Sequence, residues 1–158
     1  MTDSTIAFIG LGLIGGSIAR GIKRENPDTK IMAYMRTRSR LLSAMDEGVI
    51  DVILDGADEQ LSQCDLIFLC TPVEYNARYL AEIKPFLKPG AIITDVGSTK
   101  TDIHEEVIRL DMEDCFVGGH PMAGSEKTGF ENSTDICWKM PTTSSPPPAS
   151  LPRLQWNG

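Results

Sequence analysis

This 158-residue chain has fewer basic than acidic residues, no apolar run long enough to cross a membrane and no C-x-x-C pair of cysteines. Its 15 Lys and Arg against 22 Asp and Glu give a net charge of −7, which argues against a nucleic-acid-binding protein with a basic face. No apolar run approaches the roughly 20 residues of a membrane helix, and the N-terminus MTDSTIAFIG lacks the layout of a signal peptide. The four cysteines form no C-x-x-C pair, so we expect free thiols, no metal site and a cytoplasmic protein.

Short apolar segments recur along the chain and alternate with stretches that suit helices. The strand-like segments are 5–10, 30–35, 51–55, 65–70, 91–96 and 115–119, and the helix-compatible stretches are 13–25, 38–47, 73–87 and 99–111. Nearly continuous apolar strands alternating with helices are typical of a parallel sheet covered on both faces. The sequence therefore predicts one doubly wound, mostly parallel α/β domain over residues 1–135.

The stretch GLGLIGGS, residues 10–17, directly follows the first predicted strand and opens the first predicted helix. Gly10, Gly12 and Gly15 make G-x-G-x-x-G, in which the glycines permit a tight turn, close approach of a pyrophosphate and close helix–strand packing. Leu13 and Ile14 lie between them, where the helix N-terminus offers unpaired N–H groups to phosphates. In this context the motif predicts a Rossmann-type dinucleotide site.

The choice of cofactor depends on the end of the second predicted strand. An acid there would bind the ribose 2′-hydroxyl of NAD, but the place falls on Met35. Arg36, Arg38 and Arg40 follow instead, with Thr37 beside them, and guanidinium groups suit a 2′-phosphate. NADP is therefore favoured over NAD, with the alternative that these arginines are only a solvated loop and helix start.

Three further motifs fall at predicted strand ends, which share one edge of a parallel sheet. CTP (70–72) places Thr71 and Pro72 beside the nicotinamide half of the cofactor, and DVGSTK (95–100) adds Gly97 and Ser98. GGHPMAGSEKTG (118–129) brings His120, one of only two histidines in the chain. A neutral imidazole there can take a proton from an alcohol while hydride leaves the same carbon. The alternative is a structural histidine in a turn.

Four polar residues follow that histidine and are candidates for substrate binding. They are Ser125, Glu126, Lys127 and Thr128. Such side chains can bind carboxylates or orient a substrate, although Glu126 and Lys127 can equally form a solvated pair. The other histidine, His104, lies in the helical segment TDIHEEVIRL and is expected at the surface.

Over about residues 4–135, the order and spacing of four motifs resemble those of the prephenate dehydrogenases. The motifs are GLGLIGGS, CTPV, DVGSTK and GGHPMAGSEKTGFENS. The resemblance implies oxidative decarboxylation of prephenate to 4-hydroxyphenylpyruvate in tyrosine biosynthesis. It also implies that His120 deprotonates the ring hydroxyl, Ser98 hydrogen-bonds near it and Glu126 shapes substrate access. Arogenate dehydrogenase and a non-catalytic dinucleotide-binding module remain as alternatives.

Residues 136–158 differ from the rest and hold five of the chain's ten prolines without periodicity, so we expect a disordered tail. The resemblance implies that the prephenate dehydrogenases continue into a helical domain, which dimerises, closes the cleft and supplies an arginine. If the codons for Cys137–Pro141 are read one base out of frame, any choice of codons encodes Leu-Glu-Asn/Asp-Ala. The resemblance implies this same sequence as the family's next segment. Our hypothesis is a one-base deletion near Asp135–Ile136, in the gene or in its reported sequence.

Overall fold

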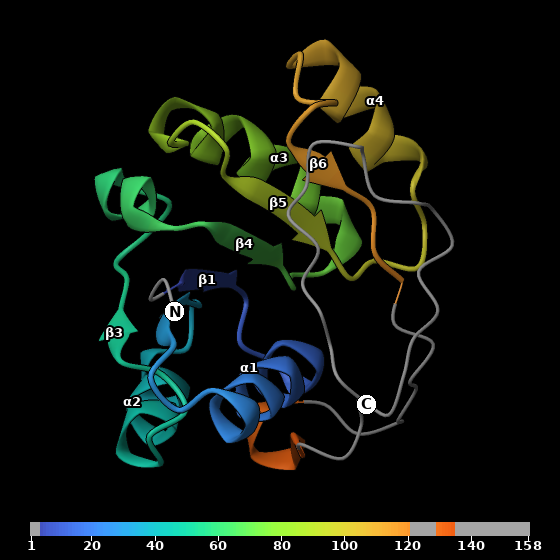
Figure 1. The fold of residues 1–158 in the computed structure, drawn as a ribbon. Helices are drawn as coiled ribbons and strands as arrows, with labels where there is room; N and C mark the ends of the chain where they lie inside the picture. The colour runs from blue at the N-terminus through green and yellow to red at the C-terminus, as the bar shows by residue number, and fades with distance from the viewer. Residues whose placement is uncertain (1–3, 121–128, 135–158) are drawn as a thin grey trace.

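One parallel sheet with helices on both faces forms the part of the chain that the computed structural model describes, residues 4–120 and 129–134 (Figure 1). Its strands lie in the order β3-β2-β1-β4-β5-β6, and all neighbouring pairs are parallel. The strands are β1 (Thr5–Ile9), β2 (Lys30–Tyr34), β3 (Val52–Ile53), β4 (Leu66–Leu69), β5 (Ile92–Asp95) and β6 (Phe116–Val117). The predicted doubly wound α/β class is confirmed.

Helices connect these strands in chain order. The α-helices are α1 (Leu13–Glu25), α2 (Arg38–Asp46), α3 (Val73–Ile83) and α4 (Thr101–Arg109). Short 3-10 helices are η1 (Glu59–Gln63), η2 (Lys84–Phe86) and η3 (Phe130–Asn132). The chain runs outward from β1 through β2 to β3, then returns to β4 and runs the other way. The direction of winding therefore reverses between β1 and β4.

The predicted elements are correct in order, and they differ from the structure at their ends. The stretch predicted as one helix over 73–87 ends as α3 at Ile83 and continues as η2, because Pro85 has no N–H to donate. The strands predicted at 51–55 and 115–119 shorten to two residues each. Both are edge strands, which have a neighbour on one side only.

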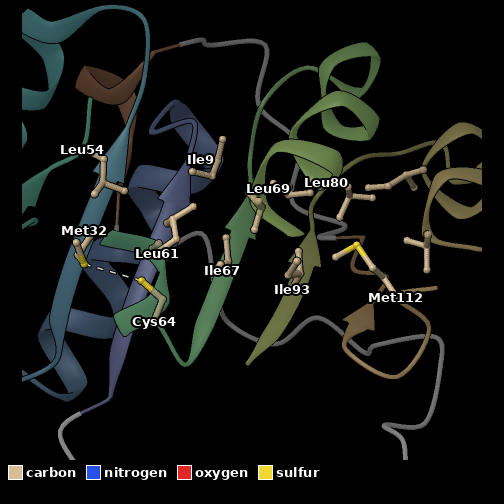
Figure 2. Close-up of a cluster of buried hydrophobic side chains, with 14 residues drawn as sticks. Ile9, Met32, Leu54, Leu61, Cys64, Ile67, Leu69, Leu80, Ile93 and Met112 are labelled. Carbon is tan, nitrogen blue, oxygen red and sulfur yellow. Dashed lines mark hydrogen bonds between the residues drawn. The ribbon is translucent and has the colours of Figure 1, made fainter. Parts of the chain in front are cut away.

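The core has two layers, one on each face of the sheet, because successive residues of a strand point to opposite faces. On one face Ile9, Ile67, Leu69 and Ile93 line up across neighbouring strands and pack against Leu80 of α3 (Figure 2). The other face packs against α1 and α2. Its buried residues on the strands and helices include Ile6, Phe8, Ile31, Ile18, Ala19, Leu41 and Ala44. Burial on both faces explains why the strands read as continuous apolar runs.

The cysteines that the structure describes, Cys64, Cys70 and Cys115, are free thiols. Cys64 is fully buried beside the sulfur of Met32 at 3.9 Å (Figure 2). Burial raises the pKa of the Cys64 thiol to about 11, so it stays protonated at neutral pH and packs as a small apolar side chain.

None of the helices within 4–120 and 129–134 has the length and apolar character needed to cross a membrane. The four predicted substrate-binding residues, 125–128, and the segment 136–158 lie outside the described residues.

Candidate active site

The sequence motifs converge where the winding of the sheet reverses. Tyr34, Ile9, Leu69 and Asp95 are in register across the carboxyl ends of β2, β1, β4 and β5. The glycine loop leaves β1 at this row, and the segment that begins at Thr71 follows β4. Ligands of open parallel sheets bind at such a reversal, outside the carboxyl ends of the strands. The candidate site therefore lies along this edge.

The three motif glycines differ in what surrounds them. Gly10 has a φ of +96°, and a Cβ there would lie 2.7 Å from the carbonyl carbon of Cys70. A Cβ on Gly15 would lie 2.5 Å from the Gly10 carbonyl oxygen. Around Gly12, by contrast, no atom of the described chain apart from its two neighbours in sequence lies within 4 Å of the Cβ position. The first and third glycines thus serve packing, while the second leaves room for a ligand to approach the backbone.

The N-terminus of α1 offers an anion site at the same place. Gly12 is its N-cap, no side chain caps the first turn, and no acidic residue lies in that turn. The first N–H groups of a helix lack partners within the helix and carry the positive end of its dipole. A pyrophosphate fits this arrangement, with Leu13 and Ile14 supplying the N–H groups and Gly12 the space.

The three arginines after β2, which the sequence grouped together, have different partners. Arg38 pairs with Asp55 at 2.7 Å, and Arg40 pairs with Glu131 at 3.0 Å. Arg36 is exposed, and its guanidinium carbon lies 5.7 Å from the ring centroid of Tyr75. Of the three, Arg36 alone has no carboxylate partner within the described residues. It is therefore the best placed to bind an additional phosphate.

A buried ion pair organises the other half of the edge. Asp95 is 1% exposed, and both of its carboxylate oxygens accept hydrogen bonds from Lys100 Nζ at 2.6 Å. The same carboxylate accepts the backbone N–H of Gly97 at 2.9 Å and of Gly119 at 3.2 Å. Lys100 also donates to the Gly119 carbonyl. One carboxylate thus joins the loop after β5 to the loop after β6.

This ion pair anchors the residue before each of the two candidate chemical groups. Ser98 follows Gly97 and His120 follows Gly119, so each lies one residue beyond a glycine that donates to Asp95. Both residues are exposed rather than packed in the core. The motif DVGSTK predicted Gly97 and Ser98 as site residues but not this role of Asp95 and Lys100. The signal was present, because an acid that ends a buried strand needs a nearby counter-charge.

The segment after β4 contributes one buried polar group without a partner. Thr71 Oγ1 donates to Asn76 Oδ1 at 2.6 Å, and Asn76 is fully buried in the first turns of α3. Its Nδ2 is the only buried side-chain nitrogen or oxygen of the described residues that has no hydrogen-bond partner. An unsatisfied buried donor is costly, and the described structure gives Asn76 Nδ2 no acceptor. Pro72, exposed, is the N-cap of α3.

Residues 129–134 return to the nucleotide-binding helix, a contact that the sequence did not predict (Figure 1). Phe130 is 2% exposed and packs on α1, where a Cβ on Gly16 would lie 2.7 Å from its ring. Arg20 lies over that ring at 4.5 Å and donates to Ser133 Oγ at 2.9 Å. Gly16, outside the G-x-G-x-x-G motif, is thus a docking position for this segment.

Comparison with known proteins identifies the family. A family model described as "Prephenate dehydrogenase, nucleotide-binding domain" matches residues 18–140. The chain belongs to this family. The predicted resemblance to the prephenate dehydrogenases is confirmed.

Individual members of the group share both sequence and fold with the chain. Prephenate dehydrogenase of Lactococcus lactis subsp. cremoris (strain MG1363) is 42% identical over 130 residues, 78% of this chain and 35% of that enzyme. Prephenate dehydrogenase from A. aeolicus, crystallised with hydroxyphenyl propionate and NAD+, matches with a TM-score of 0.79 and 30% identity over 87% of this chain and 48% of that chain. Synechocystis arogenate dehydrogenase matches with a TM-score of 0.73 and 34% identity over 82% of this chain and 45% of that chain. The chain spans less than half the length of each.

Proposed function

We propose that the chain is the nucleotide-binding part of an NAD(P)-dependent dehydrogenase of tyrosine biosynthesis, which oxidatively decarboxylates prephenate to 4-hydroxyphenylpyruvate. The observation that carries the proposal is the anchoring of the Ser98 and His120 loops by one buried carboxylate, Asp95, beside the glycine loop. A protein that only bound a dinucleotide would not need an exposed histidine next to the anchored Gly119. The relatives named above support the reaction class.

Each group along the edge has a role in this proposal. The glycine loop and the N-terminus of α1 bind the pyrophosphate, and Thr71, Pro72 and Gly97 border the nicotinamide half. When bound, the nicotinamide supplies the hydride acceptor. His120 in its neutral form takes the proton from the ring hydroxyl, while Ser98 hydrogen-bonds near that hydroxyl. Loss of the ring carboxylate as CO2 then restores aromaticity, which makes the reaction essentially irreversible.

Prephenate and arogenate differ only in the side chain, which carries a keto group in one and an amino group in the other. The proposal takes prephenate as substrate, as the name of the Lactococcus relative indicates. Arogenate is the alternative, because the Synechocystis relative is an arogenate dehydrogenase.

The proposed substrate-binding residues remain Ser125, Glu126, Lys127 and Thr128. As in the family, we expect a homodimer formed through a helical domain, without nucleic-acid or membrane partners, in the cytoplasm.

For the cofactor, the proposal favours NADP over NAD. It rests on Arg36, which is exposed and has no carboxylate partner among the described residues, and on Met35, which stands where a carboxylate would select NAD. Met35 packs against the core beside α1 and α2 and offers no acceptor to a ribose hydroxyl.

An assay of two proteins with two cofactors and two substrates tests the function. The gene would be expressed as reported and with the reading frame restored near Asp135–Ile136, and each product given NAD or NADP with prephenate or arogenate. We expect the frame-restored enzyme to reduce NADP when prephenate is added. Reduction only when arogenate is added would show that arogenate, not prephenate, is the substrate. Dinucleotide binding without reduction in any combination would show that the protein is a non-catalytic binding module.

A further inference from the structure

Tyr75 is an exposed aromatic residue that the proposed function leaves without a role. It lies in the first turn of α3, is 39% exposed, and is one of three large apolar side chains exposed to this degree among the described residues. The other two, Leu42 and Ile108, lie on α2 and α4. Tyr75 differs from them because its ring faces a cation, Arg36.

The contact between Tyr75 and Arg36 spans the strand that leads into the glycine loop. Arg36 follows β2 and Tyr75 follows β4, and β1 lies between these two strands in the sheet. Neighbouring strands are about 5 Å apart, so the two residues start from backbones separated by roughly 10 Å. Their side chains meet across the carboxyl end of β1, with the guanidinium carbon 5.7 Å from the ring centroid. This is within the range of a cation–π attraction.

We propose that Tyr75 is a positioning residue that holds Arg36 across this edge, ready for the 2′-phosphate of NADP. The inference rests on the proposed preference for NADP. A free arginine side chain loses rotamer freedom when it binds a phosphate. Contact with the Tyr75 ring restricts Arg36 before the ligand arrives, and Arg38 and Arg40 are restricted by carboxylates instead.

Binding measurements on the full 158-residue chain test this inference without any turnover. Calorimetry with adenosine 2′,5′-bisphosphate and with AMP isolates the 2′-phosphate, because the two probes differ only there. We expect Tyr75→Ala to weaken the bisphosphate about two- to fivefold, the range for an exposed cation–π contact, and to leave AMP unchanged. Tyr75→Phe keeps the ring face and should bind like the wild type.

Two further variants make the result decisive. In an Arg36→Ala background, Tyr75→Ala should cause no further loss, because the residue it positions is gone. Ile108→Ala removes another exposed apolar side chain, on α4, and should change neither affinity. Equal loss of both probes in Tyr75→Ala, or no loss of either, would overturn the role of Tyr75. Equal affinity of the wild type for both probes would instead overturn the NADP preference, and this inference with it.

Discussion

At the scale of single residues, the arginines after β2 show how neighbours in sequence take different roles. Arg36 and Arg38 lie two positions apart and carry the same charge, yet among the described residues only Arg38 has a carboxylate partner. We expect Arg36→Ala to lose a charge-assisted contact of about 1.5–3 kcal/mol with the 2′-phosphate, which weakens NADP roughly 10- to 150-fold and spares NAD. Arg38→Ala is the matched control, since it removes the same charge two residues further on, at the start of α2. Calorimetric titration of both variants with both cofactors makes the comparison, and equal loss of NAD and NADP in Arg36→Ala would refute the assignment.

His120 carries the chemical step in the proposed mechanism, so its replacement should act on rate rather than on binding. In the frame-restored enzyme, His120→Asn should lower turnover on the order of 10²- to 10⁴-fold, which is typical for loss of a general base. Cofactor affinity should stay the same, because the role proposed for His120 is in the chemical step and not in dinucleotide binding. His104→Asn, on an exposed position of α4, is the control. Steady-state kinetics with near-normal turnover in His120→Asn would make it a structural turn histidine.

At the scale of elements, the Asp95–Lys100 pair holds the ends of β5 and β6 together. Lys100→Met would leave the 1% exposed carboxylate of Asp95 without its counter-charge. Loss of one partner of a buried pair costs about 3–5 kcal/mol, and we expect the lower end because the Lys100 side chain is itself 36% exposed. Lys88→Met, which breaks the more exposed pair with Asp65, should cost about 1 kcal/mol or less. Urea unfolding measures both, and equal costs would show that Asp95 does not depend on Lys100.

Helix α1 offers two glycines that should respond in opposite ways to the same change. A Cβ on Gly16 would lie 2.7 Å from the Phe130 ring and 2.8 Å from Ser133 Oγ, whereas a Cβ on Gly21 would meet no described atom within 4 Å apart from its chain neighbours and the backbone of α1. Gly16→Ala should therefore destabilise by about 1–3 kcal/mol through overpacking. Gly21→Ala should stabilise by about 0.5–1 kcal/mol, because alanine favours the helix. Thermal unfolding checks the signs, and stabilisation by Gly16→Ala would show that residues 129–134 do not dock there.

The elements also show what the sequence could predict. Strand and helix order, the glycine loop and the shared carboxyl edge followed from local patterns, since apolar runs, glycines and prolines act within a few residues. Two features did not follow. Docking of Ser133 on Arg20 joins residues 113 positions apart, and no local pattern encodes such a contact. The ends of β3 and β6 depend on having one neighbouring strand, which is a property of the finished sheet.

At the scale of the whole molecule, binding and turnover should separate. Strands β1 to β6, the glycine loop and the Asp95–Lys100 pair all lie within residues 5–119, so the groups proposed to bind the dinucleotide are complete there. The chain nevertheless spans only 35% of the Lactococcus prephenate dehydrogenase and 48% of the A. aeolicus chain. Under the proposed function, residues outside this span would close the cleft and hold the substrate carboxylate.

We therefore expect the 158-residue chain to bind a dinucleotide but not to reduce it when prephenate is added. Without a closed cleft, water remains at the edge and weakens the electrostatic contacts, and the substrate is not held in a reactive pose. Calorimetry should detect the cofactor, and the ultraviolet absorbance of reduced cofactor should stay at background. The frame-restored enzyme, assayed in parallel, shows whether the missing activity returns. Robust turnover by the 158-residue chain would show that residues 1–158 form a complete active site by themselves.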